Sequence, residues 1–378
     1  MLRRNNIRTP LLSFATLLLG LPLAAVWAAD DQAAADRGAV QGEYRDLVEV
    51  SEVLLDVLVT DRQGNVVVGL TPDDFLIEEK GKALPLTGAS FYSNRFLLPD
   101  KKTGGVAKPA PGEVPADRHF VFFFHDQRRL DDPGSRIIRQ QLDAGRQAKR
   151  WIEQEMLQGD WVAVVGYDVR LKVYSDFSRD RKELADAVLR ASQGLDPGTE
   201  WASRRPVAEE GVPTLLRDLP TGKELSKASE HMYDAMSLVA EATHGIVGRK
   251  NLMLFTIGFG ELRQGFSQPD SRYWPKLKES LNDNNVAVYP IDLVPTEFEH
   301  SQENFLNELA SETGGYYYRQ FVSFITPMRQ IADEVNGYYL LSYLASHPEG
   351  ERGYREVKVK TRNPELRVRA RQGYRFGT

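Results

Sequence analysis

Residues 118–130 read Arg118-His-Phe-Val-Phe-Phe-Phe-His-Asp-Gln-Arg-Arg-Leu130. The unbroken apolar run in this stretch predicts a strand that is buried on both faces, and the charged residues after it predict the edge of a sheet. In open α/β sheets, ligands bind outside the carboxyl ends of the strands. The stretch therefore predicts both the fold class and the place of a functional site.

Downstream of this stretch, strand patterns alternate with helix patterns as far as residue 336. Such alternation indicates a mostly parallel sheet with helices on both faces. Strands are expected at 119–124, 161–167, 171–174, 251–257, 286–291 and 316–318. Helices are expected at 132–156, 181–191, 225–243, 274–284, 302–313 and 324–336, and 192–221 is expected to be a long irregular loop, a kind of segment that is often functional.

Short strand patterns flank this α/β region on both sides, at residues 44–98 and 337–378. The segment Leu366-Arg-Val-Arg-Ala-Arg371, for example, alternates apolar and charged residues, as a strand with one buried face does. Each set has too few strands for an independent sandwich. We therefore expect the two sets to pair into one antiparallel β-sandwich with the α/β domain inserted; two separate β units are the alternative.

The amino-terminal residues are typical of an export signal. Arg3, Arg4 and Arg8 precede an apolar run at 11–25, and Ala28 is a small residue suited to cleavage. An uncleaved membrane anchor is the alternative, but a spanning helix needs about twenty apolar residues. The expected domains are a signal peptide at 1–28, a flexible leader at 29–43, a β unit at 44–98, a linker at 99–117, the α/β domain at 118–336 and terminal strands at 337–378.

Composition excludes several classes of function. The chain has 378 residues and 0 Cys, which excludes disulfides, thiolate metal sites and thiol nucleophiles. Its formal net charge of −5 would fall to about −8 on loss of the three signal arginines, which argues against binding to nucleic acid or to an anionic membrane. The mature protein is expected to be exported, either periplasmic or secreted, and free of the membrane.

Four stretches of the α/β region together resemble the von Willebrand factor type A domain: His119-Phe-Val-Phe-Phe-Phe-His-Asp126, Gln158-Gly-Asp-Trp-Val-Ala-Val-Val165, Gly248-Arg-Lys-Asn-Leu-Met-Leu-Phe-Thr256 and Val286-Ala-Val-Tyr-Pro-Ile-Asp292. The flanking segments Leu55-Asp-Val-Leu-Val-Thr-Asp-Arg-Gln-Gly64, Gly69-Leu-Thr-Pro-Asp-Asp-Phe75, Tyr338-Tyr-Leu-Leu-Ser-Tyr343 and Arg369-Ala-Arg-Gln-Gly-Tyr374 extend the resemblance to the exported type A-related proteins of Acidobacteria. The resemblance covers about residues 45–376. It implies a Rossmann-like domain inserted in or flanked by an antiparallel β-sandwich.

The resemblance also implies a metal-dependent adhesion site, because type A domains usually bind partners through a divalent cation at the carboxyl edge of the sheet. Asp126 matches the first ligand of the family pattern. The two serine positions fall on Arg128 and Leu130, which offer no oxygen, and the threonine position falls near Ser229-Glu230. The last Asp position falls on Ile257 or Gly258. The implied site is therefore degenerate, and no cofactor is expected.

The residues suggest two further functions, hydrolysis and binding to an aromatic platform. A hydrolase would need a nucleophile beside His125 and Asp126, and Ser135 is the nearest hydroxyl; the sequence has none of the usual hydrolase or phosphate-loop motifs. The tyrosines at 316–318 and 338–339 could form a platform for carbohydrate or peptide, but core packing is the favoured interpretation.

The sequence thus predicts an exported, non-catalytic protein-interaction module. Its partner would be a protein with an acidic surface, bound by Asp126, Arg128, Arg129 and Glu230 together with the 192–221 loop. The first alternative is a metal-dependent adhesion module that uses Asp126 and Glu230 to hold Mg²⁺, Mn²⁺ or Ca²⁺. The second alternative is the hydrolase.

Overall fold

The computed structural model describes residues 48–93, 117–126, 134–197, 210–263, 265–298, 300–348 and 350–377. Residues Asp46–Thr378 group into one compact unit. The predicted signal peptide and leader, and most of the predicted linker, lie outside the described residues. None of the described helices is both long and apolar enough to cross a membrane.

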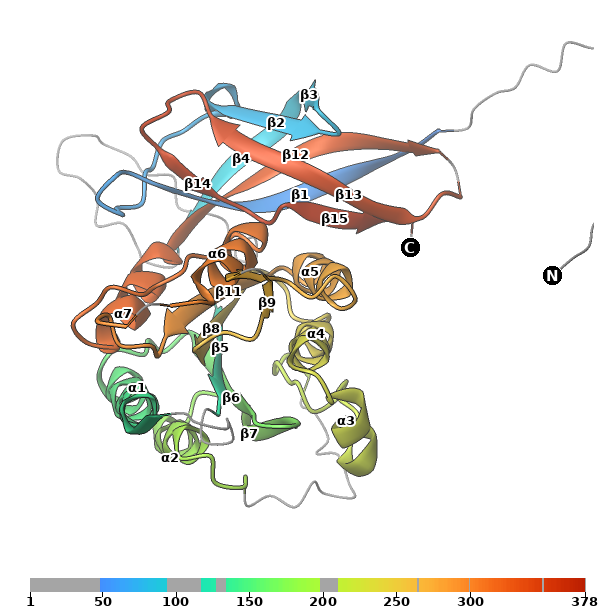
Figure 1. The fold of residues 1–378 in the computed structure, drawn as a ribbon. Helices are drawn as coiled ribbons and strands as arrows, with labels where there is room; N and C mark the ends of the chain where they lie inside the picture. Colours follow the sequence, from blue (N-terminus) through green and yellow to red (C-terminus); the bar gives the residue numbers. More distant parts are fainter. Residues whose placement is uncertain are drawn as a thin grey trace, which may run out of the picture. The chain divides into compact units, whose positions relative to one another are not determined.

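A five-stranded sheet lies at the centre of the α/β part, in the order β11-β8-β5-β6-β7 (Figure 1). The strands β5 (Arg118–His125), β6 (Asp160–Tyr167), β8 (Lys250–Thr256) and β11 (Val286–Asp292) are parallel to one another, and β7 (Leu171–Ser178) runs antiparallel beside β6. The predicted strand at 316–318 is a single bridge between Tyr318 and Ile291. The sheet confirms the predicted Rossmann-like fold class.

The central strand β5 explains why the opening stretch is apolar at consecutive positions. All eight of its residues are buried. Val121 and Phe123 pack into one core cluster, whereas Phe120, Phe122 and Phe124 pack into the cluster on the opposite face of the sheet. A strand that is covered on both faces has no solvent side and therefore no polar alternation.

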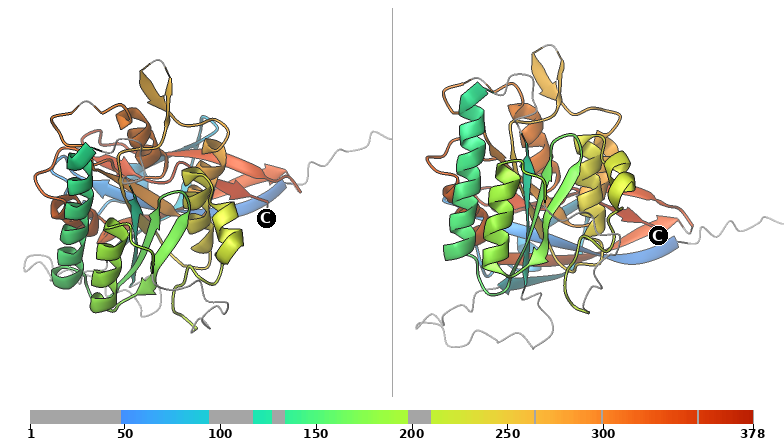
Figure 2. Two further views of the ribbon diagram at one scale, coloured as in Figure 1. Left: turned by 60° about the horizontal axis from the view of Figure 1, so that its bottom comes forward. Right: turned by 90° about the horizontal axis from the view of Figure 1, so that it is seen from below.

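Helices cover both faces of this sheet (Figure 2). The helices α1 (Gly134–Gln154), α2 (Arg181–Ser192) and α7 (Ile325–Glu334) pack on one face. The helices α3 (Gly222–Ala228), α4 (Met232–Ala242), α5 (Trp274–Asp283) and α6 (Glu303–Glu312) pack on the other.

The prediction of a single helix at 225–243 was wrong, because a turn separates two helices there, α3 and α4. The hydroxyl of Ser229 donates to the carbonyl of Leu225 at 2.7 Å and accepts the amide of Leu171 at 3.0 Å. These bonds tie the turn to the loop between β6 and β7. The next residues therefore leave the helical path, and His231 has an extended backbone.

Two antiparallel four-stranded sheets form the predicted sandwich. One has the order β14-β1-β12-β4 and the other β15-β13-β2-β3. Their strands are β1 (Val48–Thr60), β2 (Phe75–Glu79), β3 (Lys82–Leu84), β4 (Leu86–Ser93), β12 (Gly337–Pro348), β13 (Gly353–Thr361), β14 (Arg367–Arg369) and β15 (Gly373–Phe376), with a short 3₁₀ helix, η1 (Pro72–Asp74), before β2. Strands from the two ends of the chain pair directly, since β1 lies beside β12 and β2 beside β13. The shared sandwich is confirmed, and two separate β units are excluded.

The strand expected from the alternating segment 366–371 is shorter than the pattern predicted. The chain pairs with β1 only over β14, and then crosses to the other sheet as β15. The crossing passes close to a tyrosine, because a Cβ atom on Gly373 would lie 2.2 Å from the Tyr354 hydroxyl. The boundaries between the predicted domains stay a prediction.

Candidate binding edge of the α/β sheet

Polar side chains follow or end several parallel strands at the carboxyl edge of the sheet. Asp126 follows β5 directly, and its amide donates to the carbonyl of Tyr167 at the end of β6 at 2.7 Å. Thr256 ends β8 and Asp292 ends β11 at the same edge. Arg128 and Arg129 lie outside the described residues, as does the side chain of Ser135.

Asp126 is buried and held by the helices beside it. Its Oδ1 accepts a hydrogen bond from Gln141 Nε2 at 3.1 Å, and the same nitrogen donates to the carbonyl of Ser192 at 2.8 Å. The two helices approach closely because Gly145 lies at the contact, where a Cβ atom would come within 2.0 Å of Ser192 Oγ. Gln141 on α1 therefore joins Asp126, which follows β5, to the last residue of α2.

The His125 side chain is also hydrogen-bonded inside the protein. Its Nδ1 lies 2.8 Å from Thr256 Oγ1, and that oxygen accepts the amide of Gly258 at 2.9 Å. Burial lowers the pKa of His125 from 6.5 to about 4, so its imidazole is neutral at pH 7. A buried imidazole with so low a pKa is a weak general base near neutral pH.

The pH dependence of stability should report this burial. The unfolded chain protonates its His125 below about pH 6.5, whereas the folded chain does so only near pH 4, so acidification favours unfolding. Between pH 7 and pH 5, protonation of His125 in the unfolded chain should therefore lower the free energy of unfolding by about 2 kcal/mol. We expect the His125→Asn variant to lose about 2 kcal/mol less than the parent over this interval when urea unfolding is measured at both pH values.

The exposed His244 provides the control for this measurement. The His244→Asn variant should lose as much stability as the parent between pH 7 and pH 5. Equal losses in the parent and in His125→Asn would mean that the folded protein protonates His125 as readily as the unfolded chain does.

Glu230, the other candidate metal ligand, contributes its backbone here. Its carbonyl accepts the hydroxyl of Tyr167 at 2.9 Å, and its side chain is exposed. Its neighbour Ser229 is fully buried and holds the turn between α3 and α4. Among the residues that the structure describes, no group of three or more His, Asp or Glu side chains is placed to hold a metal ion.

A hairpin that the sequence did not predict rises from this edge after β8 (Figures 1 and 2). Its strands are β9 (Glu261–Arg263) and β10 (Phe266–Gln268). Three-residue strands carry too little periodicity to be read from a pattern. The nearest sequence signal is the run of glycines at 258, 260 and 265, which marks turns but not the strands between them.

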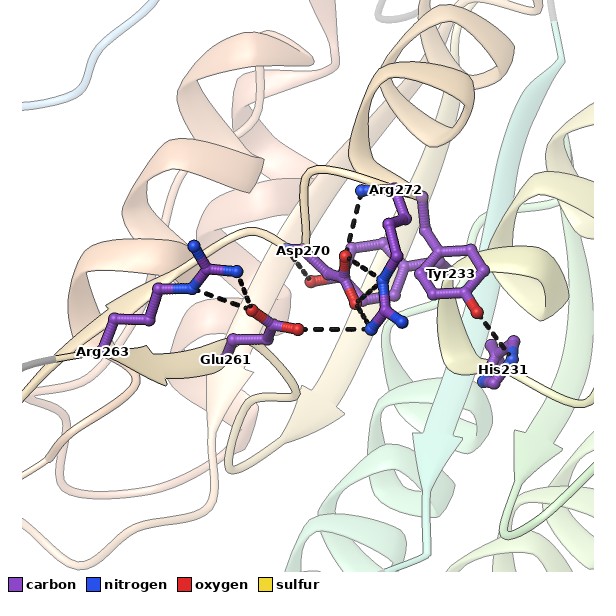
Figure 3. Close-up of polar contacts among 7 residues, drawn as sticks. His231, Tyr233, Glu261, Arg263, Asp270 and Arg272 are labelled. Atoms are coloured by element: carbon purple, nitrogen blue, oxygen red, sulfur yellow. Dashed lines mark hydrogen bonds and ion pairs between the residues drawn. The ribbon is translucent and has the colours of Figure 1, made fainter. Parts of the chain in front are cut away.

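A ladder of charges stabilises the base of the hairpin (Figure 3). Arg272 Nη2 lies 2.6 Å from Asp270 Oδ2 and 3.3 Å from Glu261 Oε1, and Arg263 Nη2 lies 2.8 Å from Glu261 Oε2. The hydrogen bonds from Arg272 hold the pKa of Asp270 well below its usual range. The two arginine side chains are 62% and 70% exposed, so this ladder faces solvent.

Aromatic side chains pack next to this group of charged residues. The amide of Asp270 donates to the Tyr233 hydroxyl at 3.0 Å, and the Tyr233 ring stacks on Tyr273 with centroids 5.8 Å apart. Tyr273 in turn places its hydroxyl 2.9 Å from His231 Nε2. The base of the hairpin is therefore packed against the aromatic rings of Tyr233 and Tyr273.

A second polar cluster orders the loop that follows β11. Asp292 is buried and accepts the Tyr317 hydroxyl at 2.6 Å and the Val294 amide at 2.8 Å, and His300 Nε2 lies 3.0 Å from it. The amide of Gln302 donates to His300 Nδ1 at 3.3 Å, so the opposite ring nitrogen, Nε2, faces the carboxylate. Sequence reasoning missed this cluster, although Asp292 at the end of an apolar strand was a signal for it.

Exposed apolar side chains are spread over the loops of this edge. Phe298 is 45% exposed and Leu262 is 58% exposed. The guanidinium of Arg136 lies over the Phe298 ring, 5.3 Å from its centroid. Together the exposed apolar residues of these loops form what we name the edge surface: Val169, Leu195, Leu262, Phe298 and Val322.

No family model matches the chain, and no curated protein matches it in sequence. Solved structures do resemble it. An aerotolerance-related membrane protein from Bacteroides fragilis is 12% identical, with 57% of this chain and 98% of that chain covered and a TM-score of 0.36. The hypothetical protein BatB from Bacteroides thetaiotaomicron is 13% identical, with coverages of 57% and 98% and a TM-score of 0.34.

A third similar structure is the ArnB paralog VWA2 from Sulfolobus acidocaldarius. It is 12% identical, with 87% of this chain and 75% of that chain covered and a TM-score of 0.34. With TM-scores below 0.5, these similarities carry no conclusion about family or activity.

Proposed function

We propose that the chain is an exported, non-catalytic module that binds a protein partner through the carboxyl edge of its α/β sheet. The observation that carries this proposal is the contrast between the interior and the rim of that edge. Inside, Asp126 and His125 are bonded to neighbouring side chains. On the rim, the edge surface exposes apolar side chains beside the charged hairpin.

This combination fits binding better than catalysis. A catalytic base must reach its substrate, whereas His125 is only 7% exposed and its pKa is about 4. Exposed apolar groups among charges are typical of protein interfaces, in which a few buried side chains carry most of the affinity. Arg128 and Arg129, which the sequence predicts at this edge, would add positive charge, and positive charge favours an acidic partner.

A paired comparison of variants tests the proposal. We expect the Leu262→Asp and Phe298→Asp double variant to capture its partner from cell-envelope extract at least about tenfold less well than the parent, because hot-spot side chains contribute about 2 kcal/mol each. The control is Val247→Asp, since Val247 is 76% exposed and lies before β8, at the amino end of the sheet.

Equal capture by the parent and the double variant would contradict the proposal. Capture that is lost in EDTA, and also lost in Asp126→Ala, would instead support the metal-dependent adhesion module. The Asp126→Ala variant must first be shown to fold, because Asp126 also anchors Gln141.

A further inference from the structure

A hollow of about 880 Å³ lies where helices α6 and α7 meet the ends of β1 and β14. Its size is within the range of small-molecule sites in proteins. Its walls come from five segments: the turn after Thr60, the helix α6, the segment 316–320, the helix α7 and the strand β14.

Buried polar atoms in the walls of this hollow have no hydrogen-bond partner in the protein. Glu334 Oε1 pairs with Arg369 Nη2 at 2.7 Å, but Glu334 Oε2 and Arg369 Nη1 are unpaired. Thr60 Oγ1 is unpaired as well, and Thr60 is 1% exposed. These atoms are covered by neighbouring protein atoms, so a ligand in the hollow would bond to the exposed polar side chains that line it, such as Gln320 and Gln330.

An aromatic ring is exposed in the same wall. Tyr316 is 47% exposed, its ring packs edge-on against Tyr318 with centroids 4.9 Å apart, and the Arg369 guanidinium lies 5.5 Å from its centroid. The position of the segment is set by Gly315, where a Cβ atom would lie 1.8 Å from the carbonyl of Val288. Tyr316 thus offers a flat apolar surface beside a set of polar groups.

The charges that line the hollow balance. Three arginines, at 319, 367 and 369, face three carboxylates, at 303, 333 and 334. Arg319 pairs with Glu303 and Arg369 pairs with Glu334, so no strong net charge draws an ion. Amide side chains add further donors and acceptors: Gln63, Asn65, Asn307, Gln320 and Gln330.

We propose that this hollow binds a neutral oligosaccharide. A pyranose ring carries hydroxyls that donate and accept, which suits the exposed amide side chains that line the hollow. Its faces also carry C–H groups, which pack well on an aromatic ring such as Tyr316. The balanced charge argues against a charged ligand. The proposal does not depend on the proposed protein partner.

Calorimetric titration of the full chain with neutral hexasaccharides tests the proposal. The probes are maltohexaose, cellohexaose, xylohexaose and chitohexaose, each at up to millimolar concentration. We expect at least one to bind, Tyr316→Ala to weaken that binding at least tenfold, and Tyr316→Phe to retain it because the ring is kept. Gln330→Ala, at an exposed position on α7, should weaken binding without affecting the fold.

Phe298→Ala is the matched control, because Phe298 is as exposed as Tyr316 but belongs to the edge surface. It should leave the saccharide affinity unchanged. Three results would overturn the proposal: no heat with any neutral hexasaccharide, equal affinity in the parent and Tyr316→Ala, or tighter binding of anionic hexagalacturonate than of every neutral probe.

Discussion

The Asp160→Ala substitution should lower the free energy of unfolding by about 3–5 kcal/mol, because it leaves a buried guanidinium without its counter-ion. Asp160 accepts two hydrogen bonds from Arg118, from Nε at 2.6 Å and from Nη2 at 2.7 Å. Both side chains are almost fully buried, at 4% and 1% exposure. Arg118 also donates to the carbonyl of Ala332 and to Asn336 Oδ1, each at 2.7 Å.

The pair connects the starts of β5 and β6 with the end of α7, so its loss should destabilise the whole α/β part. Urea unfolding followed by circular dichroism measures the effect. The control is Glu297→Ala, which removes an ion pair with Arg136 whose side chains are 61% and 58% exposed. Exposed pairs contribute at most about 1 kcal/mol. Equal effects of the two substitutions would show that Arg118 is solvated when Asp160 is removed.

A double variant separates the charge from the packing. When Arg118→Met is combined with Asp160→Leu, no buried charge remains, and stability should recover most of the loss seen in Asp160→Ala. Failure to recover would mean that the hydrogen bonds of Arg118 to α7 carry the stability, and not the compensation of charge.

The Glu79→Ala substitution should have an effect of the same size in the sandwich, about 3–5 kcal/mol. Glu79 accepts hydrogen bonds from Arg355 Nη1 at 2.6 Å, from the Tyr374 hydroxyl at 2.7 Å and from the Tyr343 hydroxyl at 3.1 Å. Burial raises the pKa of Glu79, but these donors lower it more, so it stays ionised. Removal of the carboxylate leaves Arg355 buried without its counter-ion.

The adjacent Glu78 is the control, since its carboxylate pairs with Lys360 at 3.1 Å in solvent. Glu78→Ala should cost less than about 1 kcal/mol in the same urea titration. Glu79 lies on β2 and its partners lie on β12, β13 and β15, so the network joins both sheets. Equal losses in the two variants would contradict a central role for this network.

The two substitutions together also test the domain boundaries predicted from the sequence. If the α/β part and the sandwich unfold separately, Asp160→Ala should shift one transition and Glu79→Ala the other. A single transition that both variants shift would mean that the parts unfold as one unit, as the direct contacts between them allow. One such contact is the hydrogen bond from Arg371 on the sandwich to the carbonyl of Asn282 on α5 at 2.8 Å.

The sequence by itself determined the elements whose side chains repeat with a period. The apolar run of β5 predicted a strand buried on both faces, whereas the alternation in 366–371 predicted a strand of which only 367–369 forms. Strand counting predicted that the two ends of the chain pair, since neither end has enough strands to bury a core alone. These features follow from local pattern, which a linear sequence records directly.

Only the tertiary structure decided the contents of the candidate sites. Three hydrogen bonds show this: Asp126 bonds to Gln141, His125 to Thr256, and Asp292 to Tyr317. The two residues of each pair lie on different segments of the chain. The hairpin on its aromatic base and the hollow beside Tyr316 likewise assemble from separate segments. Periodicity shows which face of an element is buried, but not which side chain of another element will meet it, because that choice depends on the packing of the whole core.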